Sequence, residues 1–500
     1  MDASGGGATE DEARRFARDF RAFLEWVHAN ASSGSANEVV ALVAGYLGEA
    51  GRAESVVRRE LPPFDHVNLQ TALNHWLTLP GRRGDCRGVT TPPHWSGTSL
   101  TQLISGEGLP PLRIAAPELI DLPNGPGTTL ACLTSALLLI DDHRGRYVVF
   151  VQGPDQHNND LVVELAGLDV ESAQAVFAEL DVLRSRLNVY RGHVLDVAVN
   201  QMGGLELTFV VADAPPRDCV ILPEAMLARL ERHALSIAVH RDALLAAGQH
   251  LKRGLLLFGP PGTGKTHSTQ YLIGQMSGYT RLIMTGRSLH AVGSVTGLAR
   301  DLQPAVIVLE DVDLVASDRS FGPGTSTVLF DLLDAMDGAA PDADLMFVLT
   351  TNRADLLEPA LAARPGRVDV AIEIALPDAE ARRRLFDLYA RAIPLDCSDA
   401  DRDVMIERTD GVTASFLKEL IRRATLEALQ DDAELGAVRA EHVTRALDDL
   451  LDSAQTVTRT LLGIGADEIA DAGPIDGPGY VFPSPAYRST VRIRRGPTRY

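Results

Sequence analysis

Residues 259–266 read Gly-Pro-Pro-Gly-Thr-Gly-Lys-Thr, a pattern whose glycines, lysine and hydroxyl suit the binding of phosphate groups. Glycine lets backbone N–H groups converge on phosphate oxygens, and the start of a helix adds partial positive charge. Lys265 would reach the β and γ phosphates, and the Thr266 hydroxyl would ligate Mg²⁺. The pattern therefore predicts a nucleotide site formed by Gly259, Pro260, Pro261, Gly262, Thr263, Gly264, Lys265, Thr266 and His267.

Acidic and amide side chains follow two further apolar runs. Glu310 and Asp311 come after the buried-type run 306–309, which places their carboxylates where a strand ends. There they could meet the bound Mg²⁺ and the attacking water. Asn352 follows the run 345–349, and its polar side chain could orient that water. Arg364 and Arg367 lie downstream and need an anionic partner or solvent.

The elements that must position these residues can be recognised from their periodicity. The run 255–258 is short and apolar, as expected of a buried parallel strand, and a helical pattern starts at Lys265. Further upstream, helical patterns in 11–27, 38–47 and 67–77 predict an α-rich unit over residues 1–90. Strand-like runs at 136–140, 147–151, 161–165, 194–199 and 205–211, with a helix at 170–187, predict an α+β unit over 91–216.

Together these motifs resemble the AAA family of ATPases over residues 220–451. Besides 259–266, the resemblance rests on Glu310-Asp311, on 350–353, on 358–361 and on 364–369. It implies an α/β P-loop NTPase domain over 217–377 and a helical AAA lid over 378–455, preceded by the α-rich and α+β N-terminal region. It also implies ATP and Mg²⁺ as cofactors, with Asn352 as sensor 1. Arg364 and Arg367 would be arginine fingers acting on ATP of the next subunit, so a homo-oligomer, usually a hexamer, is expected.

The sequence departs from the family pattern at several points. The acidic strand ends in Glu310 then Asp311 instead of Asp then Glu, an order similar to that of the branch containing the mitochondrial Rieske-protein translocases. Metal ligation then falls to Glu310 and water activation to Asp311, whose side chain is one methylene shorter. The stretch 289–293 lacks the aromatic residue that threading members carry in the pore loop, and an extra alanine precedes Arg364.

Composition limits the functional classes. The formal charge of −20 opposes non-specific attraction to nucleic acid, and no nucleic-acid partner is indicated. The apolar runs are too short for a membrane span, and the N-terminus lacks signal-peptide features, so a cytoplasmic location is expected. The four cysteines show no metal-binding spacing.

The last segment, 456–500, is predicted to be a disordered tail. It contains Arg488, Arg492, Arg494, Arg495 and Arg499 with no acidic residue after Asp476, so a docking arm for an acidic partner or a neighbouring subunit is the alternative.

We expect an oligomeric ATPase that couples ATP hydrolysis to movement of a protein client of unknown identity. The alternative is a nucleotide-gated interaction protein that binds ATP with little hydrolysis, which the Glu310-Asp311 order favours.

Overall fold

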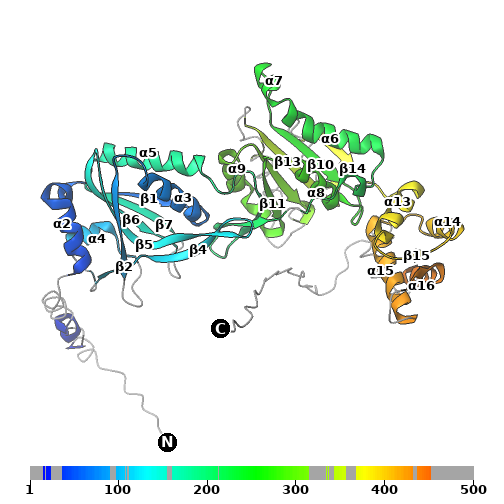
Figure 1. The fold of residues 1–500 in the computed structure, drawn as a ribbon, viewed down its shortest axis with the longest axis horizontal. Helices are drawn as coiled ribbons and strands as arrows, with labels where there is room; N and C mark the ends of the chain where they lie inside the picture. Colours follow the sequence, from blue (N-terminus) through cyan, green and yellow to red (C-terminus); the bar gives the residue numbers. More distant parts are fainter. Residues whose placement is uncertain are drawn as a thin grey trace, which may run out of the picture.

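The computed structural model describes residues 37–90, 97–106, 109, 112–154, 160–211, 213–314, 334, 336, 343–355, 368–431 and 436–451, together with 15–16 and 18–23. Three parts follow one another along the long axis of the molecule (Figure 1). They are an N-terminal unit built on one sheet, a central unit built on a second sheet, and a helical lid.

The N-terminal unit contains a seven-stranded antiparallel sheet in the order β1-β7-β6-β5-β2-β3, with β4 also paired to β5. Its strands are β1 (Val57–Leu61), β2 (Arg83–Thr90), β3 (Arg113–Ala115), β4 (Glu118–Gly125), β5 (Thr128–Asp142), β6 (Gly145–Gln152) and β7 (Leu161–Ala166). Its helices are α2 (Glu38–Ala53), η1 (Pro63–Asp65), α3 (His66–Leu77), α4 (Leu100–Ser105) and α5 (Val170–Arg186).

Helices cover both faces of this sheet. Along β5, Leu138 and Ile140 belong to the core under α3 and α5, whereas Leu137 and Leu139 face the core under α2 and α4. Successive strand residues point to opposite faces, so a strand covered on both sides must be apolar at every position. This explains the continuous apolar run at 136–140.

The predicted α-rich unit ending at residue 90 is wrong. Residues 57–61 and 83–90 are strands β1 and β2 of the same sheet as β5 to β7, so no boundary falls at residue 90. Both strands are rich in charged residues, and alternate positions of β1 are half-buried. Neither strand therefore has the apolar run from which the sequence analysis recognises strands.

The central unit contains a second seven-stranded sheet in the order β14-β10-β13-β12-β11-β8-β9. Six of its strands are parallel neighbours: β14 (Val370–Glu373), β10 (Arg253–Phe258), β13 (Leu345–Thr351), β12 (Ala305–Glu310), β11 (Thr280–Thr285) and β8 (Val194–Val199). α6 (Glu224–Val239) and α8 (Lys265–Gln275) contribute to the core on one face, and α9 (Val292–Asp301) contributes to the core on the other. The short elements η2 (Arg217–Cys219), α7 (Arg241–Ala246) and η3 (Gly286–Ala291) complete the unit.

Two strands expected in the upstream α+β unit belong to this second sheet. β8 (Val194–Val199) pairs parallel with β11, and β9 (Leu205–Val210) pairs antiparallel with β8. The predicted boundary at residue 216 is therefore displaced, because the sheet that carries the phosphate loop already includes residue 194. Local periodicity identifies a strand but not its partner, which is fixed by tertiary packing.

The lid is formed by α13 (Ala379–Ala390), α14 (Asp399–Arg408), α15 (Ala414–Asp431) and α16 (Ala440–Leu451), as the sequence predicts. A two-residue pairing of β15 (Leu395–Asp396) with β16 (Val438–Arg439) interrupts the helices. The lid has its own core, centred on Phe416, Leu417 and Leu420 of α15. The observed fold is thus an α/β P-loop NTPase domain with a helical lid and an additional N-terminal unit.

Several predictions lie partly or wholly outside the described residues. Of the helix predicted at 11–27, residues 15–16 and 18–23 are described and are helical. The predicted tail at 456–500 lies outside the described range, as do Arg364 and Arg367.

Candidate nucleotide-binding site

The phosphate loop connects the end of β10 to the start of α8, which is the strand-loop-helix context that the sequence predicts. Gly259, Gly262 and Gly264 all have positive φ angles, of 142°, 79° and 105°. A Cβ on Gly259 would lie 2.3 Å from the carbonyl oxygen of Ile374, so only glycine fits there. The loop therefore has the backbone conformation that its glycines permit.

Lys265 folds over this loop. Its Nζ donates to the carbonyl oxygens of Gly259 and Pro260, each at 2.8 Å, and the Thr263 hydroxyl donates to the Pro260 carbonyl at 2.9 Å. Burial lowers the pKa of Lys265, and the nearby carboxylates of Asp311 and Asp313 oppose that change. The loop thus holds an ammonium group beside its own backbone, where an anionic ligand could replace the carbonyl contacts.

Thr266 and Glu310 meet next to the loop. Burial raises the pKa of the Glu310 carboxyl and the charge of Asp311 raises it further, whereas the neighbouring Thr266 side chain lowers it. Hydroxyl and carboxylate oxygens are the protein ligands that Mg²⁺ prefers, usually together with phosphate oxygens. A cation would also favour the ionised form of Glu310. The donor set therefore fits Mg²⁺ bound with a nucleotide.

Asp311 occupies an unusual backbone conformation. Its φ is 50°, and it is the one non-glycine residue of positive φ in the described part of the chain. Its N–H donates to the Thr350 hydroxyl at 3.0 Å, and Val312 N donates to the Thr350 carbonyl, also at 3.0 Å. These bonds to β13 hold the turn that follows β12. Residues in such sparsely populated backbone conformations are often found at functional sites.

Asn352 lies beside Asp311. Its Nδ2 is 3.4 Å from Oδ1 of Asp311, and its backbone N–H donates to Oδ1 of Asp313 at 3.1 Å. Burial raises the pKa of Asp311, Asp313 raises it further, and Lys265 and Asn352 lower it. The two strand ends that the sequence predicts to converge, those of β12 and β13, therefore bring their polar side chains together.

A cavity of about 300 Å³ adjoins the phosphate loop. Ile221, Leu222 and Pro223 line this cavity, together with Thr263 of the loop and Ala414 of the lid. Its size and the apolar part of its lining suit an aromatic base, while Glu224, Asp378, Glu380 and Arg384 make the rest of the lining charged.

His267 is placed differently from the other residues of the predicted nucleotide site. Its Nε2 lies 3.1 Å from the carbonyl oxygen of Cys219, so the ring connects α8 to η2.

Two residues of this site, Asp313 and Ser415, carry contacts that the sequence analysis does not assign. Asp313 is buried and accepts from the Thr351 hydroxyl at 2.9 Å, as well as from Asn352 N. Ser415, at the start of α15, donates to the Gly262 carbonyl from both its N–H, at 3.1 Å, and its hydroxyl, at 3.2 Å. The acidic run 310–313 signals Asp313, but no sequence pattern connects position 415 to position 262.

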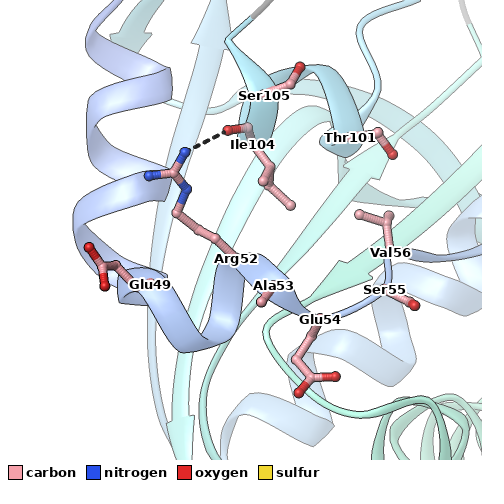
Figure 2. Close-up of a pocket in the computed structure, with 9 residues that line it drawn as sticks. All are labelled: Glu49, Arg52, Ala53, Glu54, Ser55, Val56, Thr101, Ile104 and Ser105. Carbon is pink, nitrogen blue, oxygen red and sulfur yellow. Dashed lines mark hydrogen bonds between the residues drawn. The ribbon is translucent and has the colours of Figure 1, made fainter.

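A separate cavity of about 740 Å³ lies in the N-terminal unit, between the end of α2 and α4. Figure 2 shows the Arg52 guanidinium reaching from α2 to the Ile104 carbonyl, which it contacts at 3.4 Å. Glu49, Glu54 and the hydroxyl-bearing residues Ser55, Thr101 and Ser105 complete its polar lining. The arrangement ties two helices together and contains no nucleophile paired with a base, so the phosphate loop remains the site with recognisable chemistry.

Among the described residues, no helix is long and apolar enough to cross a membrane. Nor do the described parts of the chain contain a cluster of three or more His, Cys, Asp or Glu side chains that could hold a metal ion.

Comparisons with known proteins agree with this geometry. Residues 255–376 match the family described as "ATPase family associated with various cellular activities (AAA)". Human "ATPase family gene 2 protein homolog A" is 32% identical over 237 residues, which cover 45% of this chain and 26% of that protein.

Two other relatives are similar over stretches of comparable length. "Cell division cycle protein 48 homolog" of Archaeoglobus fulgidus is 30% identical over 213 residues, covering 40% of this chain and 29% of that protein. "26S proteasome regulatory subunit 10B" of Dictyostelium discoideum is 30% identical over 232 residues, covering 42% and 58%. The chain thus spans about a quarter to little more than half of the length of these three relatives. It carries an AAA ATPase domain, with homologues in the AAA+ family.

Proposed function

We propose that this protein binds and hydrolyses ATP with Mg²⁺, and that it uses the reaction to move or remodel a protein client. The observation that carries this proposal is the convergence of Lys265, Thr266, Glu310, Asp311 and Asn352 at one edge of the parallel sheet. Positioning and electrostatic stabilisation supply most of the catalysis in phosphoryl transfer, and these residues offer both.

Each residue has a distinct role in the proposal. Lys265 leaves its loop carbonyls to neutralise the β and γ phosphates, while Thr266 and Glu310 hold the metal. Asp311 accepts the proton of the attacking water, and Asn352 orients that water and the carboxylate. The roles given to Glu310 and Asp311 follow from their order in the sequence, Glu before Asp. This order is similar to that of the Rieske-protein translocase branch.

We further propose a homo-oligomeric ring, a hexamer by family resemblance. Arg364 or Arg367 of one subunit would act on ATP held by the next subunit. An arginine supplied in this way raises turnover by about 10³- to 10⁵-fold. Hydrolysis is therefore expected to depend steeply on assembly.

The N-terminal unit is proposed to select the client. Its packing against the ATPase unit supports a mechanical connection, because Val67 and Cys132 belong to the same buried core as β12 and β13. Tyr190 also donates to the Phe64 carbonyl at 2.6 Å and stacks on Phe209 of β9 at 5.5 Å. Displacement of the sheet edge would therefore reach the N-terminal unit through β8 and β9.

The test is phosphate release measured against protein concentration. The intact chain is expected to show turnover per subunit that rises with concentration. Lys265→Ala should lose ATP binding, whereas Arg367→Ala should keep binding and lose most of the turnover. Arg83→Ala, an exposed position on β2, is the matched control and should behave like the intact chain. The proposed ring is contradicted if turnover does not depend on protein concentration and Arg367→Ala leaves it unchanged.

A second candidate function is a nucleotide-gated interaction protein that barely hydrolyses ATP. It is favoured by the short side chain of Asp311 and by the burial that raises its pKa, since a base displaced by about 1 Å can lose about 100-fold in rate. Isothermal titration beside a phosphate-release assay separates the two functions. Tight ATP binding without phosphate production at any protein concentration supports this second function.

A further inference from the structure

The start of the lid helix α15 and the phosphate loop share a pair of hydrogen bonds. The N–H and the hydroxyl of Ser415 both donate to the carbonyl oxygen of Gly262, at 3.1 Å and 3.2 Å. The first N–H groups of a helix have no partner within the helix and need one outside it. For α15, the phosphate loop supplies a partner for Ser415 N, while the Thr413 hydroxyl accepts from Phe416 N at 3.3 Å.

The lid and the loop are also in close steric contact. A Cβ added to Gly262 would lie 3.0 Å from the Ser415 hydroxyl oxygen and 3.1 Å from that of Thr413. Gly262 also has a φ of 79°, which side chains rarely adopt. Glycine at this position thus allows both the conformation of the loop and the approach of the lid.

These contacts fix the orientation of one peptide group. A trans peptide is planar, so its C=O and the N–H of the following residue point in opposite directions. With the Gly262 carbonyl held by the lid, the N–H of Thr263 points away from the lid. Peptide groups next to glycine can rotate at low steric cost, so an unheld group at this position would sample other orientations.

We propose that Ser415 is a positioning residue for phosphate binding, acting through the peptide group between Gly262 and Thr263. By holding the carbonyl on the lid side, Ser415 directs the Thr263 N–H toward the phosphates. Two donors on the carbonyl also polarise the peptide, which strengthens its N–H as a donor. Phosphate binding and lid closure therefore favour each other through one peptide group. This inference rests on the proposed nucleotide function of the loop.

The mechanism predicts different effects on the binding of the phosphates and on the binding of the base. The cavity beside the loop is lined by Ala414 and by Thr263, so it lies between the same two segments. Loss of the Ser415 hydroxyl removes one of the two bonds to Gly262 and leaves the cavity walls in place. Affinity is then expected to fall for ligands that carry phosphates and to stay unchanged for adenosine.

The experiment compares four forms of the full chain by equilibrium titration with ATP, ADP and adenosine in the presence of Mg²⁺. They are the intact protein, Ser415→Ala, Ser415→Thr and Lys418→Ala. One net hydrogen bond corresponds to about 2- to 10-fold in affinity. Ser415→Ala should weaken ATP and ADP binding by about that factor without affecting adenosine, and Ser415→Thr should restore it because the hydroxyl is retained. Lys418→Ala, an exposed change on the same helix, should have no effect.

The outcomes distinguish this inference from the proposed function. ATP affinity unchanged in Ser415→Ala overturns the inference, and so does an equal loss for adenosine, which indicates general damage to the lid. Thermal unfolding of each form identifies such damage independently. Failure of the intact chain to bind ATP overturns the proposed function instead.

Discussion

The Asn352 side chain donates to the Asp311 carboxylate across 3.4 Å, and its backbone N–H is held by Asp313 at 3.1 Å. One residue at the end of β13 therefore connects two carboxylates that follow β12. Because Asp313 is buried and also bonds Thr351, it fixes the position from which Asn352 reaches Asp311. The candidate base is thus placed by a network that spans two strands.

Replacing Asp311 with asparagine should separate binding from turnover. Asparagine tolerates a positive φ nearly as well as aspartate does, so the backbone at φ 50° should persist. An amide cannot accept the proton of water, and loss of general-base catalysis costs about 10²- to 10⁴-fold in rate. Phosphate release should fall by that factor while titration shows ATP affinity within about threefold. Equal turnover in Asp311→Asn and in the exposed control Asp213→Asn would show that another group is the base.

The pH dependence of nucleotide stabilisation should reflect the buried carboxyls. Burial raises the pKa of Glu310 above its usual 4.5 and that of Asp311 above its usual 3.8. The folded, nucleotide-free protein therefore binds more protons than the unfolded chain between the usual and the raised values. These groups consequently make it less stable as pH rises through that window. Mg²⁺ binds the ionised form of a carboxyl group and therefore competes with protons for it.

The corresponding measurement is the gain in Tm on adding Mg²⁺ and ATP, followed from about pH 5 to about pH 8. The gain should increase as pH rises above the raised pKa of Glu310. Glu310→Gln has no titrating carboxyl at this position, so its gain should be smaller and depend less on pH. A gain that decreases steadily with rising pH in the intact protein is the opposite result and excludes metal ligation by Glu310.

Most strands could be predicted from the sequence, whereas their partners could not. The apolar runs at 136–140, 255–258 and 306–309 are buried strands because both faces of each sheet are covered. By contrast, β2 has the sequence Arg-Gly-Asp-Cys-Arg-Gly-Val-Thr, which lacks such a pattern, and it becomes a strand through pairing with β5. The membership of β8 in the ATPase sheet depends on contact with β11, which lies about 85 residues later in the chain.

The residues of the nucleotide site likewise divide into those that could be predicted from the sequence and those that could not. Lys265, Thr266 and Glu310 could be predicted because a strand, a loop and a helix position them locally. The bonds of Ser415 to Gly262 join residues 153 positions apart and depend on how the lid docks. Tertiary contacts of this kind leave no periodic signal in a single sequence.

Removing Asp313 should destabilise the ATPase unit. In Asp313→Ala, the Thr351 hydroxyl and the Asn352 N–H lose their common acceptor in a buried site. A buried donor left unpaired costs about 1–3 kcal/mol, so the free energy of unfolding should fall by about 2–4 kcal/mol. Thr351→Val removes one donor together with its bond and should cost about 1 kcal/mol. Urea unfolding measures both; an Asp313→Ala protein as stable as the intact one contradicts the network.

The placement of β8 and β9 in the ATPase sheet predicts where a stable fragment must begin. A fragment of residues 217–500 lacks both strands and exposes the edge of β11, together with the apolar surface that Leu195 and Val197 cover. A fragment of residues 188–500 retains them and also keeps the stacking of Tyr190 on Phe209. We expect the longer fragment to be monodisperse and to unfold cooperatively in urea, and the shorter one to aggregate.

A point substitution tests the same relationship in the full chain. Leu195 is fully buried in the core shared with α9 and β11, so Leu195→Ala should destabilise the ATPase unit by about 2–5 kcal/mol. Val211→Ala, at an exposed position just beyond β9, is the control and should change stability by less than about 0.5 kcal/mol. If the 217–500 fragment is as stable as the 188–500 fragment and Leu195→Ala has no effect, β8 contributes nothing to the ATPase core. Loss of stability in both tests assigns β8 and β9 to the ATPase unit, so that the hairpin moves with the sheet that binds the nucleotide.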